Sequence, residues 1–196
     1  MTLMDRRRAL MMTGEEEITP LYRLKDYNFD GTVEERINTG VKLFPDDTPC
    51  TLLIDLNLTE NPTSGAGSIW CIGQEWNQTK NKAIFKIGKI NAVGQFLTFW
   101  WQDAAANTSN GMRSDVLNRK RIAMTHEENS NIITLRTKDG TKSVVTKTIS
   151  SSYTPSTNNT FFLGSTGNYA LPKGKFNLVE IYHTILSNDL INAFFL

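Results

Sequence analysis

The sequence predicts an all-β protein, built as a sandwich or a barrel of short strands. From about residue 20 onward, short β-rich segments follow one another and are separated by Gly, Asn, Asp and Ser. These turn signals recur roughly every 8 to 12 residues, which is typical of sandwiches and barrels. No extended helical period occurs in this part of the sequence. No motif repeats at a fixed interval, which argues against a propeller or a solenoid.

The first clear strand is "TLLIDLNL" at 51–58, where Leu52, Ile54, Leu56 and Leu58 recur at every second position and therefore share one face. Other segments with this short, β-rich character are also predicted as strands: 68–76, 82–90, 95–103, 121–127 and 160–166. Segments rich in Gly, Ser, Asn and Thr are predicted as loops: 61–67, 105–115 and 150–159.

A β-hairpin is predicted at 132–149. Two alternating runs flank the dipeptide Asp139-Gly140. This dipeptide favours a two-residue type I′ turn, because both of its residues tolerate a positive φ.

The stretch "GKFNLVEIY" at 174–182 is predicted as a strand buried on both sides. Phe176 and Leu178 are two residues apart, as are Val179 and Ile181, but the two pairs fall on opposite faces. The phase slip between Leu178 and Val179 indicates a β-bulge at this point.

Two short segments flank the predicted sandwich. Ser187 is expected to cap a short closing helix, with Asp189 favourably placed in its first turn. Residues 1–17 are predicted as an N-terminal arm with some helical character, outside a main domain at 18–196. The arm places three arginines before three glutamates, which is typical of a solvated or partner-docked segment.

Composition excludes several classes of function. The 196 residues include 21 basic and 20 acidic side chains, a balance that argues against a dedicated nucleic-acid surface and against polybasic membrane docking. No stretch approaches the roughly 20 apolar residues of a membrane span. The apolar run after the arginines is too short for a signal peptide, so we expect a protein that is not exported by its own signal.

The two cysteines and two histidines do not indicate a metal site or a catalytic group. Cys50 and Cys71 each lie in an apolar stretch and are interpreted as buried free thiols, and no zinc-ligand spacing is present. His183 stands at a strand end, where a cap or surface role is expected. His126 precedes two glutamates and is interpreted as part of a solvated turn.

The final stretch resembles the terminal segment of laminin-G-like domains of the concanavalin A-like superfamily. The family pattern is a Gly, an apolar strand that ends in Ile-Tyr, a polar pair, then Leu-Ser and a short helix. It is filled here by Gly174, Phe176, Val179, Ile181, Tyr182, Leu186 and Ser187. The segments at 27–44, 50–58 and 161–165 resemble other strands of the family. The chain departs from the pattern at Asn177-Leu178, where the family often has acidic residues, and at Leu190-Ile191, where it often has Glu-Ile.

This resemblance covers nearly the whole chain and implies a two-sheet antiparallel jelly-roll sandwich, with its N- and C-terminal strands side by side. Such domains usually bind glycans or protein surfaces, sometimes with calcium. Candidate calcium ligands are Asp30, Asp46, Asp47 and Asp103, but their spacing matches no known calcium loop, and no metal or other cofactor is predicted.

The segment "MDRRRALMM" at 4–12 resembles the opening of small proteins encoded by phages and prophages. We therefore expect a recognition or assembly module of a virion, in a tail, a fibre or a capsid surface. Its expected partners are other virion proteins, further copies of itself, or a cell-surface polysaccharide. Assembly residues are predicted in the arm: Arg6, Arg7, Arg8 and Leu10. A purely structural virion protein without a glycan site is an alternative.

Enzymatic activity is not expected. A retaining glycosidase needs two carboxylates about 5 Å apart. In concanavalin-like hydrolases one strand supplies them as Glu-x-Asp-x-x-Glu, and no Asp of this chain has a Glu two residues before it. Glu75 is the only acidic residue of the tryptophan-rich segment 68–76. Two acids from different strands would still permit a glycoside hydrolase, which is a second alternative.

Aromatic residues are the candidate glycan-binding groups, because a flat ring can cover the apolar face of a sugar. The candidates are Trp70, Trp76, Trp100, Trp101, Tyr153 and Tyr169. Trp100 and Trp101 are adjacent, so they must lie on opposite faces of a strand, one of them in the core. The alternative that all four tryptophans are core or sheet-covering residues stays open.

Overall fold

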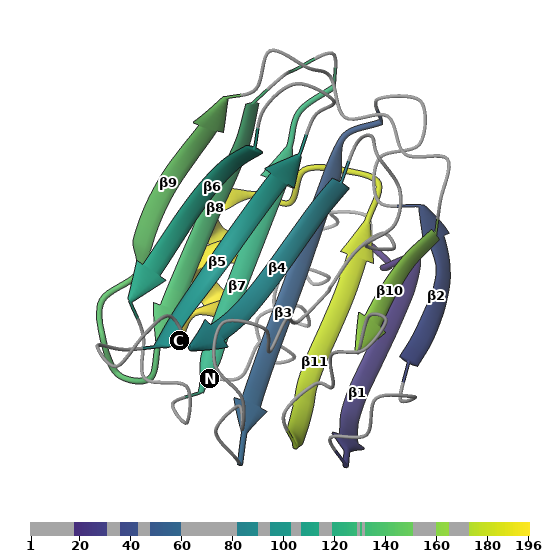
Figure 1. Ribbon diagram of the computed structural model, residues 1–196. Helices are drawn as coiled ribbons and strands as arrows, with labels where there is room; N and C mark the ends of the chain where they lie inside the picture. Colours follow the sequence, from purple (N-terminus) through teal and green to yellow (C-terminus); the bar gives the residue numbers. More distant parts are fainter. Residues whose placement is uncertain are drawn as a thin grey trace.

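The computed structural model describes residues 18–30, 36–42, 48–59, 82–89, 95–102, 107–113, 119–128, 130, 132–150, 160–164 and 173–196 (Figure 1). These residues form eleven strands and one helix. The strands are β1 (Tyr22–Phe29), β2 (Arg36–Lys42), β3 (Cys50–Leu58), β4 (Lys82–Lys89), β5 (Gln95–Gln102), β6 (Asn107–Arg113), β7 (Lys120–His126), β8 (Ile132–Asp139), β9 (Val145–Ser150), β10 (Thr160–Gly164) and β11 (Gly174–Tyr182). The helix is α2 (Asn188–Phe194).

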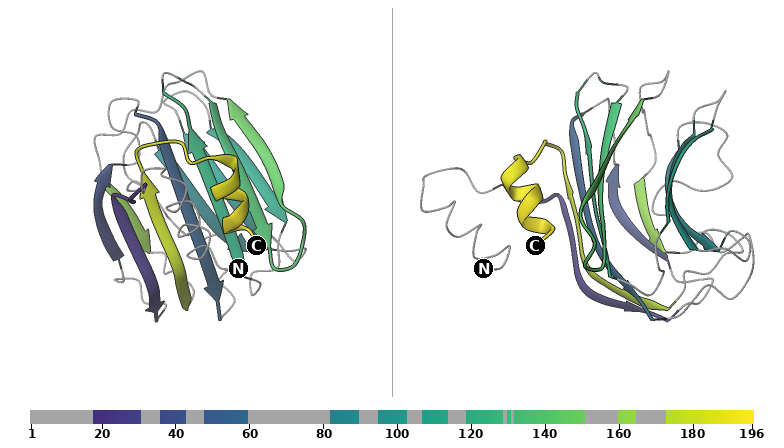
Figure 2. Two further views of the ribbon diagram at one scale, coloured as in Figure 1. Left: turned by 180° about the vertical axis from the view of Figure 1, so that it is seen from behind. Right: turned by 90° about the vertical axis from the view of Figure 1, so that its left-hand side faces the viewer.

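All strand pairs are antiparallel, as the sequence predicts. A six-stranded sheet has the order β1-β11-β3-β7-β8-β9, a second sheet has the order β4-β5-β6, and β10 pairs with β2. Helix α2 lies on one side of the six-stranded sheet, and the other strands lie on its opposite side (Figure 2). The predicted pairing of the N-terminal strand with the C-terminal strand is confirmed, since β1 lies beside β11.

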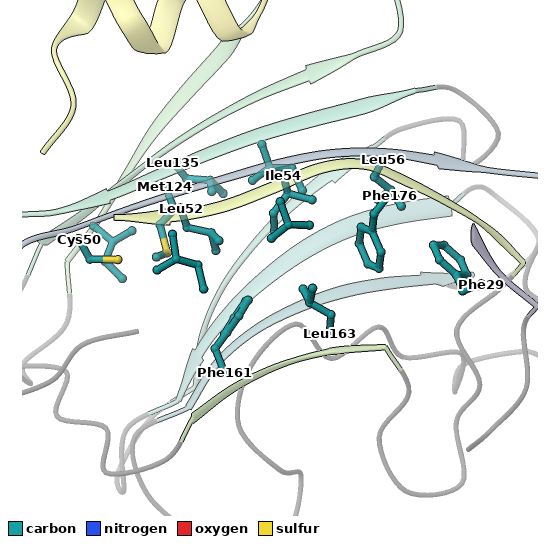
Figure 3. Packing of buried hydrophobic residues seen from close by; sticks show 14 of the residues in the cluster. Phe29, Cys50, Leu52, Ile54, Leu56, Met124, Leu135, Phe161, Leu163 and Phe176 are labelled. Carbon is teal, nitrogen blue, oxygen red and sulfur yellow. The ribbon is translucent and has the colours of Figure 1, made fainter. Parts of the chain in front are cut away.

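The main hydrophobic core lies on the inner face of the six-stranded sheet. The predicted face of β3 is confirmed: Leu52, Ile54, Leu56 and Leu58 are all buried there. Phe161 and Leu163 of β10 approach this face from the opposite layer (Figure 3). Burying one such side chain contributes about 1.5 to 3 kcal/mol, so this contact between the layers stabilises the fold.

The outer face of the same sheet carries a second apolar cluster beneath α2. It consists of Leu53, Ala123, Tyr182, Leu186, Ile191, Phe194 and Phe195. A seven-residue helix would be marginal in isolation, so this packing is what keeps α2 folded. The predicted cap is confirmed, because the Ser187 side chain accepts a hydrogen bond from the Leu190 backbone N–H and Asp189 lies in the first turn. Lys138 also donates to the Phe195 carbonyl oxygen at 2.7 Å.

The predicted bulge in β11 is present, one residue earlier than expected. The register against β3 shifts between Phe176 and Leu178, which leaves Asn177 as the extra residue. Asp26, at the same level of the neighbouring strand β1, has a φ of 55°. Strands β1 and β11 each have one extra residue at this point, so the alternation of faces shifts in both strands together. Core-facing side chains before and after the bulge therefore lie on the same face of the sheet.

The Asp139-Gly140 dipeptide does not form the predicted two-residue turn. Asp139 is the last residue of β8 and pairs with Lys120, and the Gly140 N–H donates to the Arg119 carbonyl oxygen at 2.7 Å. Strand β8 therefore continues along β7 beyond the start of β9, whose first residue, Val145, pairs with Thr137. Only Gly140 has a positive φ, whereas a type I′ turn requires it at both residues.

Two other expectations are corrected. The polar segment 105–115, predicted as a loop, contributes strand β6. His126 is buried at the end of β7, where its Nε2 atom bonds the Ser130 carbonyl oxygen at 2.7 Å, and does not lie in a solvated turn.

The described cysteine behaves as predicted, since Cys50 is a buried free thiol whose pKa is raised by burial. The predictions for 61–67, 68–76, 151–159 and Cys71 fall outside the described residues. Within the part of the chain that the structure describes, no helix has the length and apolar character needed to cross a membrane.

Candidate functional site

Two of the predicted binding residues fall in a described strand. Trp100 and Trp101 are neighbours in β5, the central strand of the three-stranded sheet. The other predicted residues lie outside the described ranges: Trp70, Trp76, Tyr153 and Tyr169, and in the arm Arg6, Arg7, Arg8 and Leu10.

The strand register separates the two tryptophans. Trp100 pairs with Ile84 of β4 and Ser109 of β6, and Trp101 pairs with Ala83 and Thr108. Residues that alternate along a strand belong to opposite faces, and directly paired residues share a face. The register therefore assigns every position of the sheet to one of two faces, which we name after their tryptophans.

The Trp101 face has the composition of a sandwich core. Besides Trp101, it comprises Ala83, Phe85, Ile87, Lys89, Gln95, Leu97, Phe99, Thr108, Asn110 and Met112. Seven of these eleven positions are apolar, and the two charged or amide residues of β4 and β5 stand at the strand ends. A sandwich requires one such apolar face on each sheet, directed at the other layer.

The Trp100 face has a different character. Besides Trp100, it comprises Lys82, Ile84, Lys86, Gly88, Phe96, Thr98, Gln102, Asn107, Ser109, Gly111 and Arg113. Trp100 lies in the middle strand of the three, toward the end of that strand, and its same-face neighbours include Ile84, Gln102 and Ser109. This face therefore combines two aromatic positions, Phe96 and Trp100, with residue types that donate and accept hydrogen bonds.

The polar neighbours of Trp100 in β6 could not be recognised from the sequence alone. Asn107 and Ser109 belong to β6, whose polar composition is that of a loop. Their place beside Trp100 follows only from the pairing of β6 with β5. A polar run of strand length after a tryptophan-rich strand is the one signal that could have indicated them.

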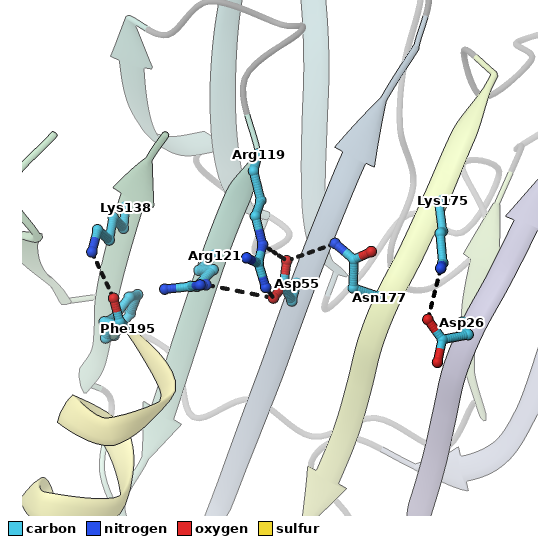
Figure 4. Close-up of polar contacts among 8 residues, drawn as sticks. All are labelled: Asp26, Asp55, Arg119, Arg121, Lys138, Lys175, Asn177 and Phe195. Carbon is cyan, nitrogen blue, oxygen red and sulfur yellow. Dashed lines mark hydrogen bonds and ion pairs between the residues drawn. The ribbon is translucent and has the colours of Figure 1, made fainter. Parts of the chain in front are cut away.

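The outer face of the six-stranded sheet offers a contrasting site, built around Asp55 of β3. Its carboxylate accepts hydrogen bonds from Arg119 and, at 3.0 Å, from Asn177, and Arg121 lies 3.5 Å away (Figure 4). The hydrogen bond with Asp55 raises the pKa of Arg119. This carboxylate therefore joins β3 to Arg119 and Arg121 on one side and to Asn177 of β11 on the other.

The other buried carboxylates are also paired with cations. Glu180 accepts from Arg23 Nε at 2.7 Å and from the Tyr182 hydroxyl at 2.7 Å. Asp139 contacts Lys120 Nζ at 2.6 Å and Lys142 Nζ at 2.8 Å.

The pKa of Asp139 is shifted in the direction opposite to that of a catalytic general acid. Burial acts to raise the pKa of Asp139, but hydrogen bonds from the two lysines outweigh it, and the net pKa is lowered. A general acid requires a raised pKa instead. In the described ranges, no group of three or more His, Cys, Asp or Glu side chains is placed to hold a metal ion.

No protein-family model matches the chain, and neither does any curated protein sequence. Solved structures do match it. The CBM40 domain of the Ruminococcus gnavus IT-sialidase, in a complex with α2,3-sialyllactose, aligns with a TM-score of 0.60 at 13% identity, over 89% of this chain and all of that domain. A legume lectin-like domain from Entamoeba histolytica aligns with a TM-score of 0.51 at 10% identity, over 84% of this chain and 91% of that one.

A bacteriophage protein shares the same architecture. The carbohydrate esterase of the Shiga toxin-encoding bacteriophage phi24B aligns with a TM-score of 0.51 at 8% identity, over 83% of this chain and 89% of that one. At sequence identities this low, these structural alignments establish a common fold alone. The described strands, their antiparallel order and the closing helix therefore form a jelly-roll sandwich of the kind found in carbohydrate-binding domains.

Proposed function

We propose that this protein is a non-enzymatic carbohydrate-recognition module whose glycan site is the Trp100 face of the β4-β5-β6 sheet. The observation that carries this proposal is the strand register, which places Trp100 on the more polar face of the sheet and Trp101 on the apolar face. The apolar face is the one suited to the core. The proposal therefore assigns the Trp100 face to the outer side of the sandwich.

The residue types of the Trp100 face suit a sugar ring. An indole covers the apolar C–H face of a pyranose with little loss of side-chain entropy. Gln102, Asn107 and Ser109 supply donors and acceptors for hydroxyl groups at adjacent positions. Gly111, on the same face, adds no side-chain bulk beside the ring position.

The carboxylates favour binding over hydrolysis. The three described strands of this sheet contain no Asp or Glu. A hydrolase needs two carboxyl groups across the scissile bond, one of them with a raised pKa. The buried acids in the described part of the six-stranded sheet are each held by a lysine or an arginine instead.

The similar structures support the substrate class and the setting. They are a sialidase domain bound to sialyllactose, a lectin-like domain and a phage carbohydrate esterase. Together with the phage-like opening of the sequence, they favour a virion recognition protein that contacts a host glycan.

The glycan site is tested by glycan-array binding followed by calorimetric titration of the best ligand. Trp100→Ala is expected to weaken binding at least about tenfold, and Trp100→Phe, which keeps a flat ring, is expected to lose less. Trp101→Phe is the matched control on the opposite face and should retain affinity. Wild-type protein that binds no glycan would contradict the proposal in favour of a purely structural virion role. Release of reducing ends from a bound polysaccharide would instead establish a hydrolase.

The N-terminal arm is proposed as the assembly element of the same protein, with other virion proteins or further copies of the chain as partners. Deleting residues 1–17 should leave a folded domain that no longer assembles. Circular dichroism and light scattering would follow the two properties separately. An unfolded truncation product would show that the arm belongs to the core.

A further inference from the structure

Three cations gather around one carboxylate on the outer face of the six-stranded sheet. Arg119 and Arg121 both contact Oδ2 of Asp55, which is the one carboxylate at ion-pair distance from them among the residues that the structure describes. Lys138 is the direct partner of Arg121 in strand β8, and its ammonium group donates to the Phe195 carbonyl oxygen (Figure 4). Asp55 can neutralise one of the three charges. The outer cationic cluster, which is Arg119, Arg121 and Lys138, therefore keeps an excess of positive charge.

The strand register makes this excess charge unfavourable in a single chain. Arg121 and Lys138 occupy directly paired positions, where like charges destabilise a sheet. The one acidic residue of helix α2, Asp189, lies in its first turn, at the opposite end of the helix from Phe195. An anion supplied from outside would therefore relieve a repulsion between Arg121 and Lys138.

The donors of the cluster are already held in position for such an anion. The Arg121 side chain is only 14% exposed, so its aliphatic stem is packed, yet none of its nitrogen atoms is buried without a partner. Its guanidinium N–H groups therefore reach solvent. Asp55 holds Arg119, and the Phe195 carbonyl oxygen holds Lys138. A guanidinium fixed in this way can bind a carboxylate through two parallel hydrogen bonds with little loss of side-chain entropy.

The chain itself contains a complementary acidic segment. Residues 15–17 are three consecutive glutamates, the only such run of acidic residues in the sequence, and they directly precede Ile18. The chain after this run is tied to the sheet, because the Leu21 N–H donates to the Ile181 carbonyl oxygen at 2.8 Å. The side chains of Ile18 and Leu21 are nevertheless 42% and 55% exposed. The base of the arm thus lacks an apolar anchor on its own domain, which favours contact with another molecule.

We propose that the outer cationic cluster is the docking site for residues 15–17 of a second copy of this chain. This inference rests on the assembly role proposed for the arm and names the surface that receives it. Ion pairs at partly exposed sites are individually weak and are screened by salt, so self-association should weaken as the salt concentration rises. Removing the charges on either side of the contact should weaken self-association about tenfold.

The test is the self-association of the full-length chain, measured by sedimentation velocity at about 50 and about 300 mM NaCl, on either side of physiological ionic strength. The variants Glu15→Gln/Glu16→Gln/Glu17→Gln and Arg121→Gln/Lys138→Gln should each raise the dissociation constant about tenfold at the lower salt. The two sets combined should weaken association little further, because each set alone already removes the same contact.

Three further variants serve as controls. Arg121→Lys/Lys138→Arg keeps both charges and should retain most of the association. Lys25→Gln/Lys42→Gln removes the same charge as Arg121→Gln/Lys138→Gln, but from two exposed residues of β1 and β2, and should behave as the wild type does. Circular dichroism checks that each variant is folded. Lys138→Gln alone leaves both arginine contacts with Asp55 in place and should still weaken association about threefold.

Several outcomes would overturn the inference. A wild-type chain that stays monomeric would leave other virion proteins as the partners of the arm. Association that requires the arm but ignores Arg121→Gln/Lys138→Gln would leave the assembly role intact and exclude this docking surface. Fully additive weakening in the combined variant would indicate two separate contacts, and equal weakening in Lys25→Gln/Lys42→Gln would indicate a general effect of charge. Association that survives deletion of residues 1–17 would remove the inference and the proposed assembly role together.

Discussion

The two sheets of the sandwich use their outer faces in opposite ways. The six-stranded sheet buries apolar residues beneath α2 and pairs its arginines with carboxylates (Figure 4). Among the described elements, none lies beyond the β4-β5-β6 sheet on the side away from the six-stranded sheet (Figure 2). The comparison teaches that one sheet is closed on its outer side by the chain itself, and we propose that the other sheet carries the glycan site.

The largest expected effect separates the two faces of the smaller sheet. Trp101→Ala should lower the free energy of unfolding by about 3 to 5 kcal/mol, because the proposed face assignment gives this large ring to the core. Trp100→Ala should lower it by less than about 1 kcal/mol, as expected at a surface position. Urea denaturation of both variants measures the difference. A reversed order of the two effects would mean that the faces are assigned the wrong way round.

The buried ion pair of the larger sheet should give the next largest effect. Lys120→Met leaves the buried Asp139 with only Lys142, whose side chain is mostly exposed, and should cost about 3 kcal/mol. The double variant Lys120→Met/Asp139→Leu should recover much of this loss, because no buried charge is then left unpaired. Urea denaturation again gives both values. A double variant as unstable as the single one would show that the pair acts through packing.

The same pair predicts a pH dependence. The pKa of Asp139 is lowered in the folded protein, so its stabilisation is complete above the unfolded value of about 3.9 and is lost as the pH falls through the folded value. The difference in unfolding free energy between wild type and Asp139→Asn should therefore shrink as the pH is lowered from 6 toward about 3. A difference that stays constant over this range would exclude the ion pair as its source.

Gly174 should show a smaller effect at the junction of β1, β11 and β3. An added Cβ would meet the Asn57 carbonyl oxygen and would lie 2.8 Å from Phe29 Cζ. Gly174→Ala should thus cost about 2 to 3 kcal/mol by thermal denaturation. Gly40→Ala is the control, because its Cβ meets nothing within 4 Å and only its φ of +71° disfavours a side chain, at about 1 kcal/mol. Equal costs at the two sites would argue against the close approach.

The smallest effect is expected at the start of α2. Ser187→Ala removes the side-chain acceptor for the Leu190 N–H and should cost about 1 kcal/mol. Ser187→Asp keeps an acceptor and should be nearly neutral. Thermal denaturation would measure both. If both variants lose the same stability, the hydroxyl acts in some way other than capping.

Much of the fold could be predicted from the sequence because apolar alternation marks strands that line a core. Strands β3 and β11 are predicted for this reason. The cap at Ser187 is predicted separately, because a serine followed by Asp189 is typical of a helix start. Strand β6 was missed because a polar sheet-edge strand held by backbone hydrogen bonds has no apolar period. The turn at Asp139 was misassigned because a long-range pairing with Lys120 overrides the local preference of the dipeptide.

The candidate site was only partly predictable. Because Trp100 and Trp101 are adjacent, the sequence predicts that they lie on opposite faces of a strand. Proposing which of the two belongs to the binding face required the residues paired with each one in the neighbouring strands. Those partners come from strands separated in sequence, so their register is a tertiary property.

The position of β11 also governs how the protein can fold. It is the eleventh strand along the chain, yet it lies between β1 and β3, and it pairs Ile181 with Tyr22. Strand β1 therefore has no partner in this sheet until a segment about 150 residues away has been synthesised. Closing such a long loop is entropically slow, so we expect folding over roughly milliseconds to seconds, with the docking of β11 as the committing step.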